Sequence, residues 1–198
     1  MDHDSCPICQ EPSIPDTQRT ANAVDAVVVS NGCETHYRRA GSGAPVLLLL
    51  TAADCGAEGR LFQHLARYFR VIAPHLDTCG GDTGPALDSS EWLKGVIEGL
   101  GLWSPAVVAD DGFALRALAF GLSNPGQIGR LALLVRDVQA AATSEDRAGE
   151  DETYAFEEVL EGSGRHLLLI RNPSREAADI DRCQLDRIVR FLGGEDGD

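Results

Sequence analysis

Short apolar runs alternate along this chain with segments whose apolar residues recur every three or four positions. The runs are typical of strands buried on both faces, and the periodic segments are typical of amphipathic helices. Parallel central strands are predicted at 46–50, 71–73, 107–109, 131–135 and 167–170. Helices are predicted around 61–68, 88–100, 112–122, 154–160 and 180–192, the last with Cys183 and Ile188 on its apolar side. This alternation predicts an α/β fold: a mostly parallel sheet with helices on both faces.

A hairpin is predicted before the parallel strands. Residues 26–30 and 34–39 read as two strands joined by Asn31-Gly32, the dipeptide that most favours a tight hairpin turn. Residues 1–22 are polar and proline-containing, so we interpret them as an extended N-terminal arm. Residues 23–193 then form one domain, and residues 194–198 form an acidic tail.

Composition narrows the function classes. The chain has 198 residues, of which 43% are apolar, so it can bury the core of one ordinary domain. Its 17 Lys and Arg residues against 31 Asp and Glu residues give a net charge of −14. Such a charge disfavours nucleic acid and anionic lipid as partners. No apolar run is long enough to insert into a membrane and no secretory pattern is visible, so a cytoplasmic location is expected.

Several short sequence fragments follow one another in a characteristic order along the chain. They are NG at 31–32, GSGAPVLLL at 41–49, FRVIAPHL at 69–76, LGL at 100–102 with VVA at 107–109, and NP at 124–125 with IGRLALL at 128–134. Together they resemble the α/β-hydrolase superfamily over residues 26–137, with a weaker match at 165–193. The resemblance implies a shortened, catalytically degenerate hydrolase-like fold in which the last strand and the helical cap are reduced.

In that family a nucleophile lies on a sharp turn between a strand and a helix, in the pattern G-x-S-x-G. The corresponding stretch here is VADDGFA at 108–114, which places Asp111 at the nucleophile position and the large Phe113 two residues later. The resemblance to haloalkane dehalogenases and epoxide hydrolases implies that an Asp here can form an ester intermediate. The alternative is that Asp111 is the N-cap of the following helix.

The other catalytic elements of the family depart from its pattern. The loop that usually reads His-Gly is TAAD at 51–54, and its Asp54 is unfavourable beside a developing oxyanion. No His follows His166 in the chain. Asp179 and Asp181 could stand in for the acid, but both are predicted in the first turn of a helix, where acidic residues normally complement the helix dipole. His75 is predicted at the carboxyl end of a strand and could pair with Asp111 across neighbouring strand ends; the alternative is a structural histidine.

Two further features concern histidine and cysteine. His64 is predicted on the surface of the first helix. His3, Cys6 and Cys9 have a spacing that suits tetrahedral zinc, with a fourth ligand from Cys33, Cys55, Cys79 or another chain. The alternative is a reduced, flexible tail.

We therefore predict a non-catalytic hydrolase-like subunit or docking module of a larger assembly. It would contact other protein subunits through the N-terminal arm and the open face at the strand ends. Apart from the zinc, no cofactor is expected. The alternative is a small hydrolase that acts on an ester, an epoxide or a haloalkane, with Asp111 as nucleophile and His75 as base.

Overall fold

The computed structural model of the chain describes residues 23–50, 59–75, 89–135, 167–171 and 180–194. The predicted arm at 1–22, the predicted helix at 154–160 and the tail beyond Gly194 lie outside these residues.

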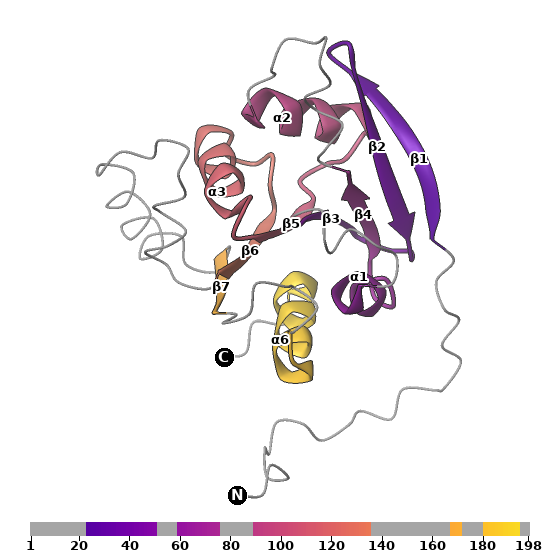
Figure 1. Ribbon diagram of the computed structural model, residues 1–198. Coiled ribbons are helices and arrows are strands. Elements are labelled where there is room, and N and C mark those ends of the chain that lie inside the picture. Colours follow the sequence, from indigo (N-terminus) through magenta and orange to yellow (C-terminus); the bar gives the residue numbers. More distant parts are fainter. Residues whose placement is uncertain (1–22, 51–58, 76–88, 136–166, 172–179, 195–198) are drawn as a thin grey trace, which may run out of the picture.

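Seven strands form one sheet in the described residues, in the order β1-β2-β4-β3-β5-β6-β7 (Figure 1). They are β1 (Val24–Ser30), β2 (Cys33–Ala40), β3 (Pro45–Leu49), β4 (Arg70–Pro74), β5 (Ala106–Asp110), β6 (Arg130–Val135) and β7 (Leu167–Arg171). Strands β3 to β7 run parallel to one another, which confirms the five predicted parallel strands.

Strands β1 and β2 form the predicted hairpin. Asn31 has a φ of 51° and Gly32 a φ of 77°, and two successive positive φ values are characteristic of the tight turn that the dipeptide favours. Strand β2 also pairs antiparallel with β4, so the hairpin extends the parallel sheet on one side.

Helices cover both faces of the sheet. Helices α1 (Arg60–Leu65) and α6 (Arg182–Gly193) lie on one face, and α2 (Ser89–Gly99) and α3 (Ala114–Ser123) lie on the other (Figure 1). Successive residues of β3 supply the two cores in turn: Val46 and Leu48 pack in the cluster beneath α1 and α6, and Leu47 and Leu49 pack beneath α2 and α3. Burial on both faces explains why this strand is a continuous apolar run.

Two details of the predicted helices are wrong. Helix α1 ends at Leu65, and Tyr68 is 40% exposed in the turn that follows. Cys183 is exposed, because the residues of α6 that face the core are Leu185, Ile188, Phe191 and Leu192, and the helical period places Cys183 on the opposite side.

Helices α1 and α6 contact each other through His64 and Asp186. The His64 side chain is only 13% exposed, so its predicted surface position is wrong. Its Nε2 lies 3.4 Å from Asp186 Oδ1, but in an orientation that does not make a hydrogen bond. Burial lowers the pKa of His64 below its ordinary value, an effect that the nearby carboxylate of Asp186 only partly opposes.

The first prediction concerns stability against pH. Because the folded-state pKa of His64 lies below its unfolded value, the unfolded chain binds the proton more readily. The free energy of unfolding should therefore fall as the pH is lowered from about 7.5 to about 5.5, across the ordinary His titration range. His64→Gln should flatten this dependence in urea titrations at several pH values. An unchanged slope in the variant would contradict the assignment.

The second prediction compares two glycines with nearly the same backbone conformation. Gly41 has a φ of 76° and Gly32 a φ of 77°. A Cβ on Gly41 would overlap the carbonyl oxygens of Phe69 and Ala66, whereas a Cβ on Gly32 meets nothing within 4 Å. Gly32→Ala should cost about 1 kcal/mol of left-handed strain, and Gly41→Ala about 2 kcal/mol more because backbone atoms must move.

Chemical denaturation of both variants measures this difference directly. Equal losses of unfolding free energy would mean that the close approach between the residues before β3 and those before β4 is absent.

Candidate functional site

The chain turns from β5 into α3 at the carboxyl edge of the sheet. Asp110 ends β5, and its Oδ1 accepts a hydrogen bond from the Gly112 N–H at 3.2 Å. The Phe113 N–H donates to the Asp110 carbonyl oxygen at 2.9 Å, which closes the turn. Asp111 is half-buried within it. Strand β3 has β4 on one side and β5 on the other, so this edge holds the reversal of strand order where α/β folds bind ligands.

Asp111 is not the N-cap of α3. The helix begins at Ala114, and its N-cap residue is Phe113, whose side chain makes no capping hydrogen bond. The carboxylate that holds the turn is the one before, Asp110, which accepts from the Gly112 N–H. The interpretation of Asp111 as a helix cap is therefore wrong.

The turn also differs from the strained nucleophile turn that is typical of the α/β-hydrolase superfamily. In the described residues, Asn31 and Ser104 are the only non-glycine residues with a positive φ, so the backbone at Asp111 lies outside the left-handed region. Phe113 packs its ring against the core beneath α2 and α3, with the Arg116 guanidinium 5.6 Å from the ring centroid. Asp111 is thus presented on a relaxed turn.

His75 follows β4 at the same edge, but not beside Asp111. Strand β3 lies between β4 and β5, so the strand ends are two spacings, about 10 Å, apart and are not neighbours. This corrects the expectation of a pair across neighbouring strand ends. The His75 N–H donates to the His36 carbonyl oxygen at 2.8 Å, on the side of the hairpin.

His75 interacts electrostatically with Asp25 of the hairpin. The pKa of Asp25 on β1 is lowered, chiefly by its hydrogen bond from Arg38 at 2.8 Å, and burial opposes this. His75 adds a smaller lowering of the same pKa. The electrostatic effect of His75 thus reaches β1, away from the β5 turn.

Asp181 has a structural role. Its Oδ1 accepts from the Gln184 N–H at 2.8 Å, and the Asp181 N–H donates to Gln184 Oε1 at 3.2 Å. This reciprocal pair is a capping box that begins α6. Asp181 thus acts at the start of the helix, which is the role that acidic residues in a first helical turn normally have.

Several predicted site residues lie outside the described residues. They are the loop at 51–54, His3, Cys6, Cys9, Cys55, Cys79, His166 and Asp179. The remaining zinc-ligand candidate, Cys33, is half-buried on β2. Within the described ranges, no three His, Cys, Asp or Glu side chains gather in a way that would hold a metal ion.

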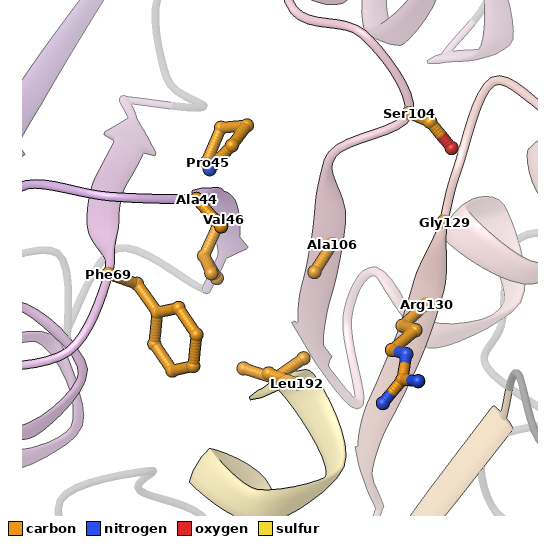
Figure 2. A pocket seen from close by; sticks show the side chains of 9 residues that line it. All are labelled: Ala44, Pro45, Val46, Phe69, Ser104, Ala106, Gly129, Arg130 and Leu192. Atoms are coloured by element: carbon orange, nitrogen blue, oxygen red, sulfur yellow. The ribbon is translucent and has the colours of Figure 1, made fainter. Parts of the chain in front are cut away.

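A cleft of about 220 Å³ lies at the opposite, amino edge of the sheet (Figure 2). It is lined mainly by small and apolar residues, among them Pro45, Phe69 and Leu192. The loops before β5 and β6 approach closely here: a Cβ on Gly129 would lie 2.7 Å from the Ser104 carbonyl oxygen. This cleft could not be predicted from the sequence, because its lining comes from five separate segments of the chain.

Arg130 is the charged residue of the cleft lining (Figure 2). Its Nη1 donates to the Phe191 carbonyl oxygen in the last turn of α6, and its guanidinium lies 5.6 Å from the centroid of the Phe191 ring. A cation at this position satisfies a terminal carbonyl and complements the dipole of the helix. Arg130 therefore anchors α6 to β6.

No protein-family model matches this chain, and no curated protein matches its sequence. Its structure is similar to that of the epoxide hydrolase CorEH, with a TM-score of 0.51 and 24% identity, over 72% of this chain and 53% of that one. It is also similar to the carboxylesterase CesB (YbfK) from Bacillus subtilis, with a TM-score of 0.50 and 19% identity, over 57% and 43% of the two chains. The haloalkane dehalogenase DatA from Agrobacterium tumefaciens C58 matches at 0.45 and 22%, over 57% and 40%.

The similarities to CorEH and CesB establish the fold. The chain has the α/β-hydrolase fold, as the order of its sequence fragments implied. It spans about half the length of these enzymes or less. Among the described helices, none combines the length and the apolar character needed to cross a bilayer.

The third prediction tests the anchoring role of Arg130. Arg130→Met keeps most of the aliphatic stem and removes the donor to the Phe191 carbonyl. It should lower the free energy of unfolding by about 2 kcal/mol, the usual worth of a charge-assisted hydrogen bond. Arg187→Met, an exposed arginine of α6, is the matched control and should change stability by less than about 0.5 kcal/mol. Equal effects in the two variants would contradict the anchor.

Proposed function

We propose that the carboxyl edge around Asp111 is a hydrolytic site, with Asp111 as the nucleophile toward an ester, an epoxide or a haloalkane. The observation that carries the proposal is the half-buried carboxylate of Asp111, directly after β5 at the reversal of strand order. The fold supports it, because proteins of this fold include an epoxide hydrolase and a carboxylesterase. Aspartate is also a residue type that forms covalent intermediates.

The chemistry is an attack by a carboxylate oxygen on an electrophilic carbon. With an ester, the bond between the carbonyl carbon and the alcohol oxygen breaks, the alcohol leaves and the acyl group forms an anhydride with Asp111, which water then hydrolyses. With a haloalkane, the carbon–halogen bond breaks, halide leaves and an alkyl ester of Asp111 forms. With an epoxide, the ring carbon–oxygen bond breaks and the ring oxygen takes a proton from water. Water then attacks the carbonyl carbon of the ester, which releases the alcohol and restores the carboxylate.

The second step needs a base to take a proton from the attacking water. His75 is separated from the β5 turn by β3, so we do not assign this role to it. Among the described residues, no histidine lies beside the β5 turn, so we propose that hydrolysis of the ester is the slow step. An alkylated Asp111 should then accumulate during turnover.

A non-catalytic docking subunit is the second candidate function. It is favoured by the relaxed backbone at Asp111 and by the large Phe113 where the family pattern has a small residue. In this case the carboxyl edge would bind a partner protein, and the predicted zinc ligands His3, Cys6 and Cys9 would belong to the partner-binding arm. The two functions differ in whether Asp111 is alkylated.

The fourth prediction separates them. The purified chain is assayed with a nitrophenyl ester, an aryl epoxide and a bromoalkane, and its intact mass is recorded during the reaction. Product should form with at least one substrate, together with a mass increase equal to the group transferred to Asp111: an acyl group from the ester, a hydroxyalkyl group from the epoxide or an alkyl group from the bromoalkane. Asp111→Asn should abolish the adduct and lower turnover by about 10³-fold or more, as expected for loss of a nucleophile.

Glu34→Gln is the matched control, since it removes a carboxylate from an exposed position of β2. It should retain the activity and the adduct. Absence of turnover and adduct with all three substrates, in a chain shown by circular dichroism to be folded, would favour the docking subunit.

A further inference from the structure

Charge is divided unevenly between the described residues and the rest of the chain. The described residues contain 12 Lys and Arg against 8 Asp and Glu, a net charge of +4. The remaining residues contain 5 against 23, a net charge of −18, which accounts for the −14 of the whole chain. The described residues therefore carry a net positive charge, although the whole chain is acidic.

Much of the positive charge lies on the side of the sheet covered by α1 and α6. Residues 59–75 contain three arginines and no acidic residue, and α6 contains three more. Four exposed arginines belong to α1, the turn after it and α6, and make no ion pair with any described acidic residue. We call them the arginine face: Arg60, Arg67, Arg187 and Arg190.

The arginine face is continuous across the two helices. Helices α1 and α6 contact each other through His64 and Asp186. The charges of Arg67, which follows α1, and Arg182, which begins α6, both lower the pKa of His64. Arg67 comes directly after the C-cap of α1 and Arg182 is the first residue of α6, so arginines lie at both elements of this helix–helix contact.

The N-terminal arm leaves the domain on this same side. Ala23 packs against the core cluster beneath α1 and α6, and Val24 pairs with Arg39 at the end of β2. Residues 1–22 contain four acidic residues and one arginine, a net charge of −3. Fully extended, 22 residues reach roughly 70 Å, whereas the 12 residues of α6 are about 18 Å long. The arm is long enough to cross both helices.

We propose that residues 1–22 dock on the arginine face of their own chain. The sign of the charge, the starting point at Ala23 and the length of the arm all fit this occupant. Attachment at Ala23 gives the arm an effective concentration in the millimolar range, which favours it over a second copy or a separate polyanion. The inference does not depend on the hydrolytic role of Asp111.

The chain carries its own reporters for this docking. Cys183 is exposed in the first turn of α6, between the arginines of that helix, and the arm contains Cys6 and Cys9. Diamide oxidises two nearby thiols to a disulfide: each thiol loses a proton and an electron, and the diamide becomes the hydrazine. Brief treatment of the full chain should join Cys6 or Cys9 to Cys183 within a product of monomer mass, identified by peptide mass spectrometry.

Charge reversal tests whether the arginine face is responsible. Arg187→Glu with Arg190→Glu should lower the yield of this disulfide at least about threefold, because two attractive charges become repulsive. Lys94→Glu, an exposed charge on α2 across the sheet, is the matched control and should leave the yield unchanged. In the unmodified chain, 1 M NaCl should lower the yield as well, since salt screens exposed charges. The measurement in 1 M NaCl keeps the test valid if the double variant does not fold.

Three results would overturn the proposal. A disulfide-linked dimer would mean that the arm reaches the face of a second copy. Equal linkage to Cys33, which lies on the hairpin, would mean that the arm samples the surface without docking. A yield that neither salt nor charge reversal changes would mean that the arginine face does not hold the arm.

Discussion

Burial of the central strands on both faces is the constraint on which the rest of this structure depends. Val46, Leu47 and Leu48 follow one another on β3 and are each at most 1% exposed, which requires a helix layer on either side. A leucine buried in this way contributes about 2 kcal/mol through the hydrophobic effect. Polar chemistry is consequently confined to the two edges of the sheet and to the outer surfaces of the helices.

Each of those regions carries a different feature. The carboxyl edge holds Asp110 at the end of β5, whose side chain closes the turn, and the half-buried Asp111 directly after it. The amino edge holds an apolar cleft beside the anchor between Arg130 and α6. The outer surface of α1 and α6 carries the arginine face, with a charge opposite to that of the chain as a whole.

The sheet could be predicted from the sequence because its determinants are local. A continuous apolar run identifies a strand covered on both faces, and Asn31-Gly32 identifies a hairpin turn by its backbone conformation alone. The order of strands is not local. Because β3 lies between β4 and β5, the expected approach of His75 to Asp111 failed although both strand ends were predicted at the right edge.

Features that depend on packing between distant segments were also missed. The sequence neighbours of His64 gave no sign that α6 would cover it, since its contact Asp186 lies far along the chain. Asp111 was a reasonable helix cap by residue type, but the side chain of Asp110 takes the Gly112 N–H and the helix begins later. The arginine face could not be predicted from the net charge of the chain, because that charge also includes the acidic residues outside the described ranges.

The central claim is that Asp111 becomes covalently attached to substrate, and the fate of one oxygen atom tests it most directly. A single turnover, with enzyme in excess over substrate, is run in water labelled with heavy oxygen, and the peptide that contains Asp111 is then analysed by mass spectrometry. If water attacks the carbonyl carbon of an Asp111 ester, heavy oxygen enters the carboxylate of Asp111. If the label is found in the product alone, or if no product forms, Asp111 is not the nucleophile and the account is contradicted.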